Sequence, residues 1–100
     1  MTPKIHIPQA QIEALCRRNR VRRLALFGSV LRDDFGPQSD VDILVEFQPG
    51  TTMGLRFFGL QEELTALIGR PVDLNTPGFI SPYFREEVLA NAEDVYVAEG

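Results

Sequence analysis

The hexapeptide DVDILV, residues 40–45, places two aspartates in an apolar run that has the composition of a buried strand. Residues two apart lie on the same face of a strand, so Asp40 and Asp42 are expected to point together, about 6.6 Å apart along the chain. Carboxylates this close repel each other, and an apolar sheet beside them adds a desolvation cost. A divalent cation between them would offset this repulsion, and hard oxygen ligands favour Mg²⁺ over zinc.

A third aspartate, Asp73, occurs in a second strand-like segment, PVDLN. If the two strands are neighbours, three carboxylates converge on one place. The alternative interpretation is that aspartates beside turns are helix caps or solvated strand ends. That alternative applies readily to Asp40, which follows a turn-like sequence, and much less readily to Asp42, which is set between two β-branched residues.

A short motif, Gly28-Ser29, ends the apolar run that precedes these aspartates. A strand that ends in Gly-Ser and continues into a short helix presents free backbone N–H groups and the positive end of a helix dipole, which suit a phosphate. Glycine permits close backbone approach, and the serine hydroxyl can donate to a phosphate oxygen. Most Gly-Ser pairs are ordinary turns, so the significance of this pair lies in its spacing to Asp40.

Helical and strand-like periods alternate along the chain and must position these residues. Helices are expected from Pro8 to about Asn19, over 29–35, over 53–68, and from Pro82 onward with Ser81 as N-cap and Phe84, Val88 and Leu89 facing inward. Strands are expected over 22–28, 40–47, 71–75 and 94–98. The alternation predicts one α/β (α+β) domain over residues 1–100, a small mixed β-sheet with helices packed on it.

Composition excludes several other classes of protein. Cys16 and His6 are each the only residue of their type among 100, so a disulfide framework, a cysteine or histidine metal site and a Ser-His-Asp triad are poorly supported. The chain has no apolar run long enough to cross a membrane and no signal-peptide pattern, which predicts a cytoplasmic protein. The net charge of -4 argues against direct nucleic-acid binding.

Gly28-Ser29, ten residues, and then Asp40-Val41-Asp42 resemble the signature of the DNA polymerase beta-like nucleotidyltransferase superfamily. A third aspartate in a later strand also fits that pattern. The segments LFGSVLRDDFGPQSDVDILVEF, FFGLQEELTALIGRPVDL and SPYFREEVLANAEDVYV resemble the minimal nucleotidyltransferases, which contain little beyond the catalytic core. The resemblance covers nearly the whole chain and implies a polymerase beta-like nucleotidyltransferase core.

This resemblance implies an enzyme in which an acceptor hydroxyl attacks the α-phosphorus of ATP and pyrophosphate leaves. Asp40 and Asp42 would bind two Mg²⁺ ions. Asp73 would complete the second metal site and help to deprotonate the acceptor. Gly28-Ser29 would hold the triphosphate, and Arg32 would neutralise phosphate charge, although a solvated helix charge is the alternative for Arg32.

The resemblance also implies an acceptor. Several minimal nucleotidyltransferases accompany a HEPN-type ribonuclease toxin, so the first expectation is an antitoxin that adenylylates this partner within a hetero-oligomer. A second possibility is transfer to a small hydroxyl compound such as an aminoglycoside, although those enzymes usually carry an added helical domain. A third is a module that neutralises its partner by binding alone.

Two further features of the sequence have no role in this reaction. Five arginines occur at positions 17, 18, 20, 22 and 23. They suit a helix C-terminus and a solvated loop, or else a contact with an acidic partner or RNA phosphates. Glu46 shares the strand face of Asp40 and Asp42 and is expected to be solvated at the strand end.

Overall fold

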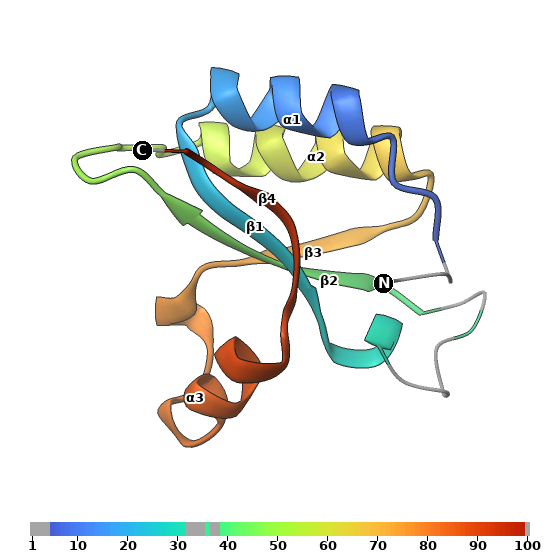
Figure 1. Cartoon of the computed structure of the whole chain (residues 1–100), viewed down its shortest axis with the longest axis vertical. Helices are drawn as coiled ribbons and strands as arrows, with labels where there is room; N and C mark the ends of the chain where they lie inside the picture. The colour runs from blue at the N-terminus through green and yellow to red at the C-terminus, as the bar shows by residue number, and fades with distance from the viewer. Residues whose placement is uncertain (1–4, 32–35, 37–38, 100) are drawn as a thin grey trace.

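The computed structural model describes residues 5–31, 36 and 39–99. The elements follow in the order α1 (Gln9–Arg18), β1 (Val21–Phe27), η1 (Gly28–Leu31), β2 (Val41–Phe47), α2 (Arg56–Ile68), β3 (Val72–Asn75), η2 (Pro77–Phe79), α3 (Pro82–Asn91) and β4 (Glu93–Val97) (Figure 1). The described strands form one four-stranded sheet in the order β3-β2-β1-β4. β1 runs antiparallel to β2 and β4, whereas β2 and β3 are parallel. The predicted small mixed sheet is therefore confirmed.

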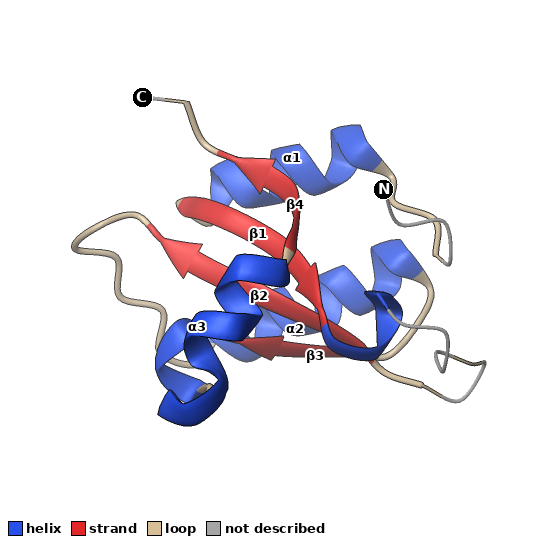
Figure 2. Cartoon of the chain, turned by 60° about the horizontal axis from the view of Figure 1, so that its bottom comes forward, coloured by secondary structure: helices blue, strands red, loops and turns tan. Residues whose placement is uncertain are grey.

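The helices lie on both sides of this sheet. α1 and α2 cover one face, and α3 lies against the opposite face near one end (Figure 1 and Figure 2). Alternate residues of β2, namely Val41, Ile43 and Val45, belong to the hydrophobic core. The core also contains Ile12, Leu15 and Cys16 of α1, Leu24 and Leu26 of β1, Leu60, Leu64 and Ile68 of α2, and Val72 and Leu74 of β3. Because side chains alternate along a strand, Asp42 faces away from this core.

Several predicted boundaries shift, and two of these shifts bear on the candidate site. β2 begins at Val41, so Asp40 precedes the strand. The Val41 amide donates to the carbonyl of Pro71 at 2.8 Å, but Pro71 has no N–H with which to continue the parallel ladder. The short helix expected over 29–35 is a 3₁₀ helix over Gly28–Leu31, and residues 32–35 lie outside the described part of the chain.

The side chains of α2 close the outer edge of β3. Gln61 accepts a hydrogen bond from the Leu74 amide at 2.9 Å, and Thr65 accepts one from the Val72 amide at 3.1 Å. An unpaired edge strand would otherwise offer these amides to another chain. Gly69 ends α2 with a φ of 80°, which confirms the predicted glycine C-cap. Among the described residues, no helix is long and apolar enough to cross a bilayer.

α3 begins as predicted but does not pack as predicted. The Ser81 hydroxyl accepts a hydrogen bond from the Tyr83 amide, so Ser81 is the N-cap. The inward orientation expected for Phe84 is wrong, because this side chain is 60% exposed. Val88 and Leu89 are only half-buried. The structure describes α3 throughout and buries none of its residues fully, so this helix forms a wall rather than part of the core.

Candidate active site

The candidate site lies where β1 ends and β2, β3 and β4 begin. Phe27 at the end of β1 pairs with Asp42 of β2, and Asp42 pairs in turn with Asp73 of β3. Register partners on adjacent strands present their side chains on the same face, with the strands about 4.8 Å apart. The condition stated for convergence of the aspartates, that these two strands are neighbours, is therefore met for Asp42 and Asp73.

Gly28 brings the backbone directly against Asp42. Gly28 has a φ of 75°, a conformation that residues with a Cβ rarely adopt. A Cβ added at this position would collide with Oδ2 of Asp42 and lie 3.2 Å from its Cγ. The close approach of backbone and carboxylate therefore requires glycine here. This contact places the turn after β1 directly beside Asp42.

Ser29 follows within the first turn of η1 and is half-buried. Ser29 is the second residue after β1, and the motif predicts that its hydroxyl reaches a phosphate from this position. Arg32, the third residue expected to contact phosphate, lies outside the described residues.

Asp40 lies outside the strands that carry Asp42 and Asp73. It is exposed and directly precedes β2, so strand alternation does not fix its direction. Arg70 contacts two residues that precede it: its Nη2 donates to the carbonyls of Gly36 at 2.6 Å and Ser39 at 2.9 Å. Sequence reasoning missed this role of Arg70. The only signal was its position in the short connection between Gly69 and Pro71.

The carboxylates suit a hard divalent cation. Asp42 and Asp73 supply carboxylate oxygens side by side. Within the described ranges, no three Asp, Glu, His or Cys side chains are gathered closely enough to hold one ion. Mg²⁺ is commonly bound by one or two carboxylates together with substrate phosphates, so a pair fits this mode. Asp40 is near in sequence but is not part of such a cluster.

A groove of about 750 Å³ opens beside Asp42. It is lined by Phe27, Gly28, Leu31, Asp42, Phe84, Glu87, Val88, Asn91 and Glu93. The strand ends supply one wall and α3 supplies the other. Sequence reasoning missed the α3 wall because it assigned Phe84 to the core. A volume of this order accommodates a small-molecule ligand.

Glu46 is not solvated as predicted. Its carboxylate accepts from Arg22 at 2.6 Å and from Arg23 at 3.4 Å, and Arg23 also donates to Asp94 at 2.6 Å. Burial opposes the charged form of Arg23, but its bonds to Asp94 and Glu46 raise the pKa of this guanidinium. The prediction failed because the antiparallel pairing of β1 with β2 brings Arg23 opposite Glu46.

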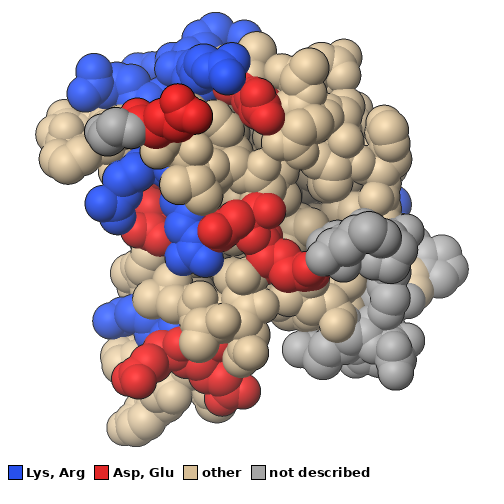
Figure 3. All heavy atoms as spheres, in the orientation of Figure 1, with Lys and Arg blue, Asp and Glu red and all other residues tan. Residues whose placement is uncertain are grey.

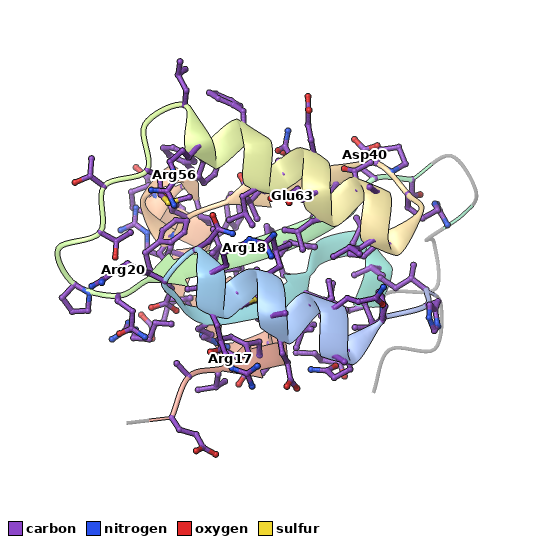
Figure 4. The ribbon with its side chains drawn as sticks, turned by 90° about the horizontal axis from the view of Figure 1, so that it is seen from above. Arg17, Arg18, Arg20, Asp40, Arg56 and Glu63 are labelled. Atoms are coloured by element: carbon purple, nitrogen blue, oxygen red, sulfur yellow. The ribbon has the colours of Figure 1, made fainter. Side chains whose placement is uncertain are left out.

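Arg17, Arg18 and Arg20, the other arginines of the run between positions 17 and 23, lie away from the candidate site aspartates. Arg17 pairs with Glu13 at 3.4 Å, and Arg18 of α1 pairs with Glu63 of α2 at 3.1 Å. Figure 4 shows Arg20 and Asp40 at opposite ends of the molecule, and Figure 3 shows basic side chains gathered over α1. A second groove of about 760 Å³ lies beside Arg17 and Arg20 but contains none of the candidate site residues.

The chain matches the nucleotidyltransferase domain family over residues 9–95. It is 39% identical over 88 residues to the protein adenylyltransferase MntA of Thermococcus cleftensis, which covers 88% of this chain and 86% of that protein. A solved structure described provisionally as a minimal nucleotidyltransferase has a TM-score of 0.69 and 34% identity, covering 89% and 88% of the two chains. A structure of a tri-AMPylated Shewanella oneidensis HEPN toxin in complex with an MNT antitoxin contains a chain with the same fold. The TM-score is 0.63 and the identity 23%, and the match covers 90% of this chain and 70% of that chain.

Proposed function

This chain belongs to the nucleotidyltransferase domain family, and from that premise we propose that it transfers the adenylyl group of ATP to a hydroxyl group of a protein. The observation that carries the proposal is the pairing of Asp42 with Asp73 beside the Gly28 backbone. Two carboxylates and a glycine turn at one edge of a sheet can hold a metal-bound triphosphate and an acceptor together. Protein adenylylation is the activity in the name of the Thermococcus cleftensis relative.

In the proposed reaction, the acceptor oxygen forms a bond to the α-phosphorus of ATP. The bond from that phosphorus to the bridging oxygen breaks, and pyrophosphate leaves with the bonding electron pair. Asp73 accepts the proton of the acceptor hydroxyl, because its exposed carboxylate lies beside Asp42 and faces the open side of the sheet. Gly28 and Ser29 hold the phosphates with a backbone amide and a hydroxyl group.

Asp42 and Asp73 are the proposed Mg²⁺ ligands, with Asp40 as a further carboxylate at the same end of the sheet. When bound, Mg²⁺ would neutralise phosphate charge and stabilise the attacking and leaving oxygens. The support for this assignment is the chemistry of the donors, since ionised carboxylates are the ligands that hard divalent cations prefer. Arg32 remains a proposed phosphate contact on the sequence motif alone.

We propose a HEPN-type ribonuclease toxin as the acceptor and this chain as its antitoxin. The support is the family relationship, together with the Shewanella oneidensis structure that pairs an AMPylated HEPN toxin with an MNT antitoxin. A protein acceptor also suits the position of Asp73, which is exposed at the rim of the site and can be reached by a side chain of a second protein. Transfer to a small hydroxyl compound and inhibition by binding alone are the competing functions.

Intact-mass measurement of a candidate HEPN toxin, incubated with this chain, ATP and Mg²⁺, tests the proposal. We expect the toxin mass to rise by one or more AMP units. The Asp42→Asn variant should abolish the increase, whereas Glu62→Gln should preserve it, because Glu62 is exposed on α2 beyond the opposite face of the sheet.

The competing functions give different results in the same experiment. A toxin that is inhibited in a stable complex without any gain in mass would show a binding antitoxin and overturn the enzymatic proposal. Pyrophosphate release that requires a small hydroxyl compound and leaves the protein mass unchanged would show a small-molecule enzyme instead.

A further inference from the structure

One stripe of α3 faces the groove beside the candidate active site. Phe84, Glu87, Val88 and Asn91 all line this groove, and their spacing of three, one and three residues places them on a single face of the helix. Arg85, on another face, donates to the carbonyls of Pro77 at 2.8 Å and Ile80 at 3.0 Å. These bonds fix the rotation of α3 and therefore the direction of the stripe.

The strand order decides which substrate this groove receives. Asp42 and Gly28 line it, as does Glu93 at the start of β4, whereas Asp73 does not. In the order β3-β2-β1-β4, Asp73 lies on one side of Asp42; on the other side lie β1, which leads into Gly28, and β4, which begins at Glu93. The groove therefore includes Gly28 of the proposed phosphate-binding turn. Asp73, the proposed general base that deprotonates the acceptor hydroxyl, lies outside it.

The groove has walls that suit an uncharged, partly aromatic group. Phe84 supplies an aromatic side chain that is 60% exposed, and Leu31 and Val88 add apolar surface. Among the residues that the structure describes, the charged side chains lining the groove are the carboxylates of Asp42, Glu87 and Glu93. Such walls disfavour a bare polyphosphate, but they suit the nucleoside half of a nucleotide, whose hydroxyl and amino groups are donors.

We propose that the groove-facing stripe of α3 is the nucleoside-binding wall of this enzyme, with the base stacked on Phe84; the proposal rests on the function proposed above. Asn91 donates through Nδ2 to the carbonyl of Glu87 at 2.9 Å, so its Oδ1 is the atom left to accept from a ligand. Together with the Glu87 carboxylate, this oxygen selects bases that carry an exocyclic amino group, and ATP should bind more tightly than UTP.

Binding of ATP and of inorganic tripolyphosphate, both with Mg²⁺, separates the nucleoside contact from the phosphate contact. Base–aromatic stacking contributes about 1–3 kcal/mol per base, so Phe84→Ala should weaken ATP binding by roughly 5- to 150-fold. Tripolyphosphate, which has no base, should bind the variant and the wild-type chain equally. Tyr83→Ala is the matched control, because Tyr83 is 92% exposed on the same helix and does not line the groove.

Each outcome of the titrations has a distinct meaning. If Phe84→Ala binds ATP as tightly as the wild-type chain does, the nucleoside wall is refuted while the proposed function stands. Equal losses for ATP and tripolyphosphate would also refute it, because they would show a general distortion of the site. A wild-type chain that binds neither ligand would overturn the proposed function itself.

Discussion

Asp42 and Asp73 are register partners on adjacent parallel strands, so strand alternation places both side chains on the same face of the sheet. Their neighbours Val41, Ile43, Val72 and Leu74 fill the core on the opposite face. The packing that stabilises these strands therefore also sets the spacing of the two acids. The parallel register of β2 with β3 brings the two aspartates together although they are distant in the sequence.

Replacing Gly28 by alanine should abolish transfer. The φ of 75° costs a residue with a Cβ about 1–2 kcal/mol, and the new methyl group would collide with the Asp42 carboxylate. We expect a lower free energy of unfolding and a loss of adenylyl transfer greater than about 100-fold, an order similar to loss of a positioned catalytic group. Denaturant unfolding and single-turnover transfer measure the two effects.

Gly50→Ala is the matched control for this variant. Gly50 has a φ of 83°, but a Cβ there would meet nothing within 4 Å. The conformational cost should be similar and transfer should be retained. Comparable loss of transfer in both variants would attribute the effect to reduced stability and not to the contact between Gly28 and Asp42.

The sequence predicted the part of the site that depends on local pattern. Alternation of polar and apolar residues identified the strands of Asp42 and Asp73, and glycine at the end of an apolar run identified the turn at Gly28. Each of these predictions needs only the side-chain period of a strand or the conformational freedom of glycine. They are confirmed by the register of β2 with β3 and by the positive φ of Gly28.

The parts that sequence reasoning missed depend on contacts between distant segments. Glu46 was expected in solvent, but β1 carries Arg23 alongside it. Arg70 bonds to carbonyls more than thirty residues earlier, a contact without a local pattern. Phe84 has the spacing of a core residue, but the face of the sheet beneath α3 carries the polar site. Hydrophobic periodicity alone does not distinguish a core stripe from the wall of a groove.

Removing the Arg23 guanidinium should destabilise the fold. Arg23 lies on β1, between β2 and β4, and binds Glu46 of β2 and Asp94 of β4. Its side chain is only 23% exposed. Arg23→Met keeps most of the aliphatic stem but removes hydrogen bonds to two carboxylates, so the free energy of unfolding should fall by about 1–3 kcal/mol. Arg17→Met, at a side chain that is 67% exposed, should change it by less than about 0.5 kcal/mol. Equal effects would show that the Arg23 bridge contributes no more than a surface ion pair.

Cys16 should make the fold sensitive to alkali. Burial, with a smaller contribution from Glu13, raises the pKa of this thiol from 9.0 to about 12. The folded chain therefore holds the thiol proton more tightly, so this contribution to stability is complete below pH 9.0 and is lost as pH rises toward 12. Within that window the free energy of unfolding should fall by up to about 1.4 kcal/mol per pH unit.

Urea unfolding between pH 8 and about pH 10.5 measures this effect as the difference in slope between the wild-type chain and Cys16→Ala. The variant leaves a cavity and starts from a lower stability, so the slopes are compared and not the absolute values. In the same samples, a thiol reagent should react with native Cys16 only as fast as the chain opens. Equal pH slopes in both proteins would show that the thiol titrates normally.

The last prediction separates the roles of the paired aspartates. Asp42 lines the groove and touches the Gly28 turn, whereas Asp73 lies outside the groove on the acceptor side. Asp42→Asn should weaken both the binding of ATP with Mg²⁺ and transfer to the protein acceptor. Asp73→Asn should retain much of the nucleotide binding and slow transfer by about 10²–10⁴-fold, the range expected when a general base is lost.

Calorimetric titration of each variant, beside single-turnover transfer with Glu62→Gln as control, distinguishes the two roles. Transfer by Asp73→Asn at a rate near that of the wild-type chain would remove Asp73 from the site. Glu46 would be a poor replacement, because Arg22 and Arg23 already bind its carboxylate.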